Sequence, residues 1–369
     1  MIKKHMETVK EESEMSSTVM FKCPCCGGYL EFDASLQKFK CLYCGQVLSE
    51  DDLREQSEQR EAEADARSAE ETRGEHSASG GLKSYHCQMC GAEIVTDSTT
   101  AATRCYYCHS PVVLHDRLDD DFRPDGVIPF ALDREAAKKA FMDYVGGKKF
   151  IDKSFYDEGQ LEMFSGVYYP WWYFDVEMDV RFEGQGTRRS VSTTPSYIIT
   201  KTKYYSVVRQ AQMAFRNVAR KALSKMDGKL SDGIHPYDAS GVKPYASGYL
   251  SGFLAETRDL ERASVQDSVV AEVNGYAGQY MRSGHTFNSL DGQTDADVKK
   301  TDSRYVLLPA WVLTWKGGKE GKTYYYMMNG QTGKICGRLP INRTKLWSLA
   351  LGAGLVVFAL LCAGGKFIW

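Results

Sequence analysis

The sequence predicts two small cysteine-ligated modules in tandem, an α+β body with mainly antiparallel strands, and one C-terminal transmembrane helix. Three observations indicate this organisation. Four cysteines with one spacing occur twice in the N-terminal third, aromatic residues concentrate after residue 140, and an uncharged run of 20 residues lies near the C-terminal end. A chain of 369 residues has room for two or three domains.

Each cysteine unit consists of two CxxC pairs separated by 14 residues. The first unit is Cys23, Cys26, Cys41 and Cys44, and the second, 64 positions later, is Cys87, Cys90, Cys105 and Cys108. Two facing CxxC turns supply four soft sulfur ligands at tetrahedral geometry, which suits a structural Zn²⁺. The spacing predicts two zinc ribbons, at residues 21–48 and 84–114, with one structural zinc ion each. Because so small a module has almost no core, we expect metal to supply most of its folding free energy.

Other interpretations of the cysteines explain less of the pattern. Residues 105–109 match the CxxCH haem-attachment motif, which leaves Cys87 and Cys90 unexplained. A thioredoxin-like redox site has one CxxC beside a βαβ pattern, and a disulfide framework needs an oxidising compartment. Cys25, inside the first unit, is an alternative to Cys26 as a ligand.

Two N-terminal segments are expected to lack a core. Residues 1–20 are charged and polar without an apolar stretch, so we expect a disordered tail and no signal peptide. Residues 49–83 begin with a charge run in which Leu53 is the one large apolar side chain. We expect this segment to be a charged helical or flexible linker, with Ser49 as the N-cap of its helix.

The α+β body is expected to span residues 115–343, with a division into two subdomains near residue 225 as an alternative. Asp133 is the predicted N-cap of a helix whose apolar residues recur at helical spacing until two consecutive glycines at 146–147 end it. A second helix is expected over residues 259–273.

The strands of the body are predicted from alternation. Apolar and charged side chains alternate strictly over residues 175–182, which predicts a strand with one buried face. We expect Gly184 and Gly186 to end this strand, and residues 197–209 to form its antiparallel partner. Residues 305–328 are expected to contain a further hairpin.

The C-terminal segment differs from the rest of the chain. Residues 346–365 carry no charge, and a helix of this length crosses a hydrocarbon core of about 30 Å. Arg343 and Lys345 precede the segment, Trp347 lies near its start, and Lys366 follows it. The positive-inside rule then predicts a C-terminal tail anchor with the bulk of the chain in the cytoplasm. A buried core helix is the alternative.

Charge and site chemistry limit the classes of function. The formal net charge is −2, and neither cysteine unit carries the dense lysine and arginine field needed for phosphate binding, so nucleic acid is not favoured. The histidines have no nucleophile at a recognisable spacing. Four cysteines per metal leave no open coordination position for a substrate. The sequence therefore predicts a protein that is not an enzyme.

Several short motifs carry a family resemblance that covers most of the chain from about residue 20. They are the second cysteine unit and residues 127–130, 166–172, 249–253 and 329–333. By these motifs the chain resembles bacterial transcription-factor-IIB-type zinc-ribbon membrane proteins, which are often labelled primosomal-helicase-like or phage replisome organisers. The chain has no GxxxxGK[ST] phosphate loop, so no helicase motor is expected. Some relatives are encoded with phage-shock protein A and SPFH proteins, and the resemblance implies a membrane tether in envelope stress with partners of those kinds.

Three hypotheses follow. The first is a non-enzymatic, zinc-binding, membrane-anchored cytoplasmic scaffold that recruits protein partners to the membrane. The alternative is a nucleic-acid-binding accessory protein of replication or transcription. The third is a zinc or thiol sensor in which Cys25 is the reactive thiol.

Overall fold

The computed structural model describes residues 18–19, 21–53, 83–87, 93–105, 110–114, 122–148, 150–151, 164–193, 197–284, 286–317, 322–337 and 342–365. These residues form one large sheet of 11 strands, a three-stranded sheet and a two-stranded sheet. Most of the strand pairs are antiparallel. The body is therefore sheet-rich and mostly antiparallel, as the sequence predicts.

The large sheet contains β1 (Thr18–Val19), β7 (Thr100–Arg104), β8 (Pro111–Leu114), β9 (Gly126–Val127), β10 (Ser165–Thr193), β11 (Ile198–Lys221), β12 (Lys243–Pro244), β13 (Leu254–Glu256), β14 (Ser289–Gly317), β15 (Lys322–Asn329) and β16 (Ile335–Gly337). The small sheets contain β2 (Leu30–Asp33), β3 (Lys38–Cys41) and β4 (Val47–Leu48), and β5 (Lys83–His86) and β6 (Glu93–Thr96). The helices are α2 (Arg134–Gly146), α4 (Gly228–Gly233), α5 (Arg262–Arg282) and α6 (Arg343–Gly365), with 3-10 turns η4 (Ala239–Gly241) and η5 (Ser247–Leu250).

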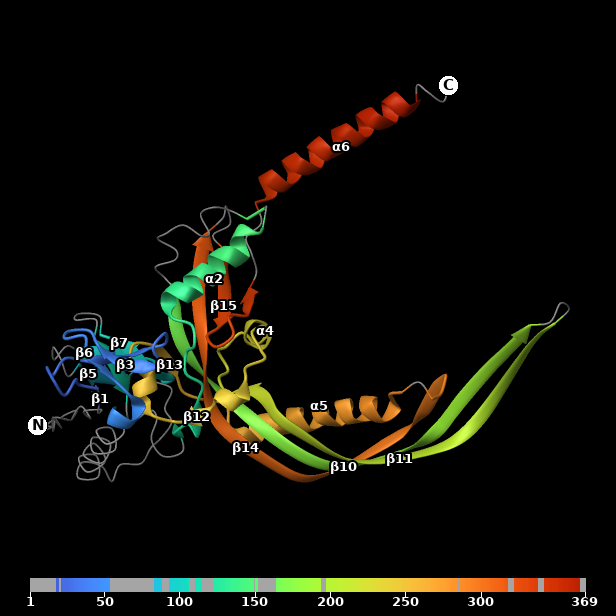
Figure 1. Cartoon of the computed structure of the whole chain (residues 1–369), viewed down its shortest axis with the longest axis horizontal. Helices are drawn as coiled ribbons and strands as arrows, with labels where there is room; N and C mark the ends of the chain where they lie inside the picture. Colours follow the sequence, from blue (N-terminus) through green and yellow to red (C-terminus); the bar gives the residue numbers. More distant parts are fainter. Residues whose placement is uncertain are drawn as a thin grey trace, which may run out of the picture.

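A long curved arm dominates the molecule (Figure 1). Its central strand is β10, which pairs antiparallel with β11 on one side and with β14 on the other. The predicted alternation is confirmed, because Val176, Met178, Val180 and Phe182 are all buried. They belong to one apolar cluster with the buried side chains of α5, which lies along the arm.

The expectation that Gly184 and Gly186 end the strand is wrong, because β10 continues for several residues beyond them. Gly184 lies directly opposite Gly292 of β14. A Cβ atom at either glycine would be 2.3 Å from a carbonyl oxygen of the opposite strand, and the ring of Phe182 lies close to both. These glycines therefore allow a close approach of two strands, with an aromatic ring in the place of their missing side chains.

Gly184→Val is expected to destabilise the arm by about 3 kcal/mol, because the new side chain overlaps the backbone of β14. Amide hydrogen exchange along β10 and β14 measures this loss. Gly275→Ala is the matched control, since it lies in α5 with nothing within 4 Å of the added Cβ, and it should stabilise the helix by about 1 kcal/mol. Equal protection of the arm in Gly184→Val and in the unchanged chain would contradict the close approach.

The ends of helices α2 and α5 can be compared with the ends predicted from the sequence. The α2 helix begins where predicted, with the Asp133 carboxylate accepting a hydrogen bond of 2.7 Å from the Ala136 amide, and it ends at Gly146. The α5 helix runs nine residues further than residue 273, the predicted end, to residue 282. Its extension is explained by Ala277 and Met281, which continue the buried stripe against the sheet.

The body is not divided near residue 225. Strand β10 precedes this position and β14 follows it, and the two pair continuously from Ser165 opposite Val312 to Thr187 opposite Ser289. Both halves of the expected body therefore contribute to the same sheet.

The N-terminal modules are joined to this sheet. The sequence predicts a disordered tail up to residue 20, but residues 18–19 form the strand β1. This strand pairs with β8, and Thr18 lies opposite Leu114. Strand β8 pairs with β7, β7 with β13, and β13 with β10.

The linker begins as predicted with a helical turn at residues 50–53, where the Ser49 hydroxyl accepts a hydrogen bond of 3.3 Å from the Asp52 amide. The rest of the tail and of the linker, up to residue 82, lies outside the described residues.

The C-terminal helix α6 projects away from the body (Figure 1). Within it, Thr344–Cys362 is 19 residues long and apolar enough to cross a membrane, and none of it is buried against the described parts of the chain. The alternative of a buried core helix therefore does not hold for these residues.

Candidate metal centre

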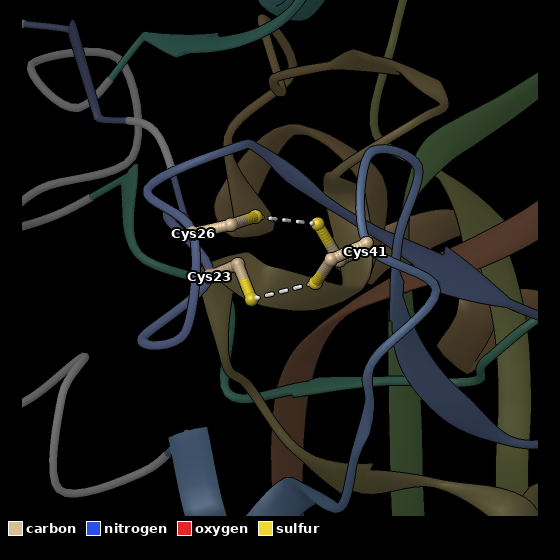
Figure 2. Close-up of side chains that lie close together, drawn as sticks. Cys23, Cys26 and Cys41 are labelled. Atoms are coloured by element: carbon tan, nitrogen blue, oxygen red, sulfur yellow. Dashed lines mark hydrogen bonds between the residues drawn. The ribbon is translucent and has the colours of Figure 1, made fainter.

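The first cysteine unit, residues 21–48, brings its four sulfur atoms together. The Sγ atoms of Cys23, Cys26, Cys41 and Cys44 all lie within 4.8 Å of one another. The Cys23–Cys44 separation is 3.6 Å and the Cys26–Cys41 separation is 3.5 Å. Figure 2 shows Cys23 and Cys26 on one turn pointing toward Cys41 on the facing turn.

The two turns have the same backbone. The Gly27 amide donates to the Cys23 carbonyl at 2.9 Å, and the Gly45 amide donates to the Cys41 carbonyl at 3.0 Å. Both glycines have φ near the left-handed value, +73° and +74°. A residue with a Cβ is disfavoured there, so the sequence CxxCG folds into this turn twice. In the second unit the equivalent residues are Gly91 after the first turn and His109 after the second, and both lie outside the described residues.

The sulfur separations fit a bound metal ion. Four sulfurs at about 2.3 Å from a Zn²⁺ at the centre of a tetrahedron lie about 3.8 Å apart. A disulfide would instead hold two sulfurs about 2.05 Å apart. The observed 3.5 and 3.6 Å are near the first value and far from the second. The four-cysteine cluster could therefore hold a metal ion.

The protonation of the thiols also favours a cation. Burial raises the pKa of the Cys41 thiol, but hydrogen bonds from the backbone amides of Cys44 and Tyr43 outweigh this effect and lower the pKa to about 7. The Gly28 amide lowers the pKa of Cys26, but the neighbouring sulfurs of Cys44 and Cys41 outweigh it and raise the pKa to about 12. The four sulfurs cannot all ionise unless a positive charge compensates them.

The first cysteine unit packs against the body through aromatic rings. Phe32 and Phe39 contact each other at 5.4 Å between ring centroids, and both contact Tyr249 of η5, at 5.1 and 5.8 Å. All three are buried in the main apolar cluster. The expectation that this module has almost no core is therefore wrong, because its core continues into the body.

Polar contacts fix the same interface. The Phe32 amide donates to the Ser251 carbonyl at 3.1 Å, and the Ser251 hydroxyl donates to the Leu30 carbonyl at 2.5 Å. Arg104 donates to Glu31 at 2.9 Å and to the Gly252 carbonyl at 2.7 Å. Because Arg104 lies on β7, this ion pair also connects the two cysteine units.

The second cysteine unit is described in part. Cys87 and Cys105 are both buried in one small apolar cluster with Tyr85, Ile94, Val112 and Leu114. Cys90 and Cys108 lie outside the described residues, so the predicted second metal site stays a prediction. The Ser110 hydroxyl lies 3.4 Å from the Cys87 sulfur in the same buried site.

A turn between β6 and β7 attaches the second unit to the body. Lys225 lies 3.0 Å from Asp97 and 2.8 Å from Glu256. Burial raises the pKa of Asp97, but hydrogen bonds from Thr100 and Lys225 outweigh it and lower the pKa to about 2. The carboxylate is therefore ionised at any physiological pH and holds this turn in place.

The cysteine pattern did not indicate the residues that position the metal centre, although residues 249–253 form one of the motifs of the family resemblance. Tyr249 and Ser251 lie more than 200 positions from the cysteines that they support. Ser110 follows the last cysteine of the second unit and belongs to no metal-ligand pattern. Their part in the site follows only from the folded arrangement.

Together these features define a chain in which a four-cysteine module docks on an antiparallel body that ends in an exposed apolar helix. The sequence is similar to YdjG of Bacillus subtilis strain 168, which is an uncharacterised protein, with 28% identity over 360 residues. The similarity covers 94% of this chain and 99% of YdjG. No family model matches the chain. No solved structure matches it either.

Proposed function

We propose that this protein is a non-enzymatic, zinc-binding scaffold, anchored in a membrane by α6 with its bulk in the cytoplasm, that recruits protein partners. The observation that carries this proposal is the exposure of α6, because none of its 19-residue stretch Thr344–Cys362, which is apolar enough to cross a membrane, is buried against the described body. Residues 346–365 carry no charge, and an uncharged helix of this length is stable in a hydrocarbon core and costly to expose to water. Arg343 and Lys345 at its start favour the cytoplasmic side for the body.

The cysteine units support a structural role for zinc in this proposal. Four thiolates complete the tetrahedral shell of a zinc ion and leave no position for a substrate. The first unit packs on the body through its sheet β2–β4. Its second cysteine turn exposes the apolar side chains Leu42 and Tyr43. Such side chains beside a rigid metal-fixed turn suit a contact with a partner protein.

The family resemblance suggests which partners to expect. Proteins of the phage-shock type or the SPFH type would be recruited to the bilayer in envelope stress. The net charge of −2 argues against the alternative, a nucleic-acid-binding accessory protein.

The test is capture of the tagged full-length chain from detergent-solubilised membranes, with and without nuclease, followed by mass spectrometry. We expect phage-shock or SPFH-type membrane proteins in both samples. Recovery should fall for Leu42→Ser combined with Tyr43→Ser, and not for Leu36→Ser, a matched change of an exposed apolar residue in the same module. Recovery of replication or transcription proteins that nuclease abolishes would instead support the alternative.

A further inference from the structure

The end of the arm is a ribbon of only two strands. The pairing of β10 with β14 ends at Thr187 opposite Ser289, whereas β10 and β11 stay paired up to Thr193 opposite Ile198. We call residues 188–193 and 197–204 the hairpin tip. Among the described strands, none pairs with the hairpin tip as a third strand. A two-stranded ribbon alone is marginally stable in water, so contact with another surface would stabilise it.

Exposed apolar side chains lie near the end of the hairpin tip, where Ile198 and Ile199 pair with Thr193 and Ser192, and we call these apolar side chains its apolar end. Val191, Tyr197, Ile198 and Ile199 are all exposed, Tyr197 by 73% and Ile198 by 74%. Because successive side chains of a strand point to opposite faces, Ile198 and Ile199 lie on opposite faces of the ribbon. An end that exposes an isoleucine on each face suits insertion into a surrounding, partly apolar medium better than packing against one flat partner.

Four basic residues lie behind this apolar end, and we call Arg188, Arg189, Lys201 and Lys203 the basic collar. Arg188 lies opposite Lys203 in the ribbon, Arg189 follows Arg188, and Lys201 lies opposite Ser190. The whole segment from residue 184 to residue 226 contains no aspartate or glutamate. The collar is therefore not neutralised within its own two strands, and it complements a surface of phosphate groups.

The neighbouring strand shows that this charge distribution is local. Acidic side chains of β14 begin beyond the end of the hairpin tip, at Asp291, Asp295 and Asp297. The net charge of −2 for the whole chain conceals this separation between a basic tip and an acidic strand.

We propose that the hairpin tip docks on an anionic lipid bilayer, with its apolar end in the headgroup region and its basic collar on the lipid phosphates. The proposal rests on the membrane anchor proposed for α6, since the same bilayer would receive both. Figure 1 shows the hairpin tip and the C-terminal end of α6 on the side of the molecule opposite to the sheet β2–β4. The tip gives the anchored chain a second contact with the bilayer and fixes the direction of the arm. Lipid is favoured over nucleic acid because two isoleucines at the end gain from an apolar medium that a phosphate backbone does not offer.

The first experiment places an environment-sensitive fluorescent amino acid at Ile198 of the full-length chain. The chain is reconstituted in nanodiscs of phosphatidylcholine, or of an equal mixture of phosphatidylcholine and phosphatidylglycerol. We expect a blue-shifted emission, quenched by nitroxide-labelled lipid, in the anionic discs and much less in the neutral discs. The same probe at Val208, an exposed apolar position on β11 farther from the tip, should show neither effect. Equal emission in the two kinds of disc would overturn the proposal.

Charge reversal tests the collar. Lys201→Glu combined with Lys203→Glu should lower the ratio of docked to free tip by roughly fivefold for each positive charge lost, and so remove the difference between the discs. Lys38→Glu combined with Lys40→Glu is the matched control, because these exposed lysines have the same spacing on β3. A loss of docking in both variants alike would overturn a specific role of the collar. A probe response to duplex DNA in place of lipid would overturn the lipid assignment.

The two proposals, the membrane anchor and the docking of the hairpin tip, can be contradicted independently. If the chain does not enter the discs, the proposed anchor fails, and the probe at Ile198 is then read after mixing the chain with vesicles of the same two compositions. A blue shift on the anionic vesicles would still support the tip, and its absence would overturn it. If the chain enters the discs without a shift at Ile198, only the tip proposal fails.

Discussion

Cys41→Ser is expected to release the metal ion from the first cysteine unit and to detach the sheet β2–β4 from the body. The variant removes one of four sulfurs that lie within 4.8 Å of one another, and the remaining three no longer complete a tetrahedral shell. Structural zinc contributes on the order of 10 kcal/mol to folding in small modules. The variant keeps the aromatic side chains Phe39 and Tyr249, which contact each other between the unit and the body. The folding free energy lost with the metal nevertheless exceeds what a few aromatic contacts supply.

Two measurements on the purified full-length chain check this result. Metal analysis should show one zinc ion fewer per chain, and hydrogen exchange should show faster exchange of β2, β3 and β4. Cys25→Ser is the matched control, because Cys25 is exposed and lies outside the four-cysteine cluster. Full metal content in Cys41→Ser would rule out the cluster as a metal site, and iron in place of zinc would change the metal but not the site.

Val356→Arg combined with Phe358→Arg is expected to move the protein from the membrane fraction to the soluble fraction. Both residues are exposed near the middle of α6. Each arginine at the centre of a membrane helix costs about 3 kcal/mol on insertion scales, so the pair costs about 6 kcal/mol. The body should keep its structure, because α6 is not buried against it.

Membrane fractionation after carbonate washing measures the change. Val356→Leu combined with Phe358→Leu is the matched control, since it alters the same positions and keeps them apolar. The metal content of the arginine variant should equal that of the unchanged chain. An arginine variant that stays in the washed membranes would show that α6 is not what holds the protein there.

Local sequence patterns predicted the structural features that depend on residues close together in the chain. The CxxC spacing predicted that Cys23, Cys26, Cys41 and Cys44 meet, because a turn of this length allows few geometries. The hydrogen bond that caps α2 at Asp133 was equally predictable, because an N-cap bond spans three residues.

Contacts between distant residues could not be predicted in this way. Glycine usually weakens a strand, so the sequence indicated that the strand ends at Gly184. Gly184 is compatible with a continuing strand here because Gly292 lies directly opposite it on β14. Pairing of β7 with β13 depends on residues about 150 positions apart, so the second cysteine unit looked like a separate module. The exposed end of the arm gave no signal by itself, since isoleucines in a strand usually indicate a core.

The docking of the first cysteine unit has a consequence for the order of events during synthesis. Leu30 and Ser251, which join the unit to the body, are 221 positions apart. At roughly 5–20 residues per second, the ribosome needs on the order of 10–40 seconds to produce the second after the first. The four thiols thus leave the ribosome long before the surface that covers their module exists. Ion capture by the nascent chain can therefore precede docking, and oxidation in that interval would leave a disulfide in place of the cluster.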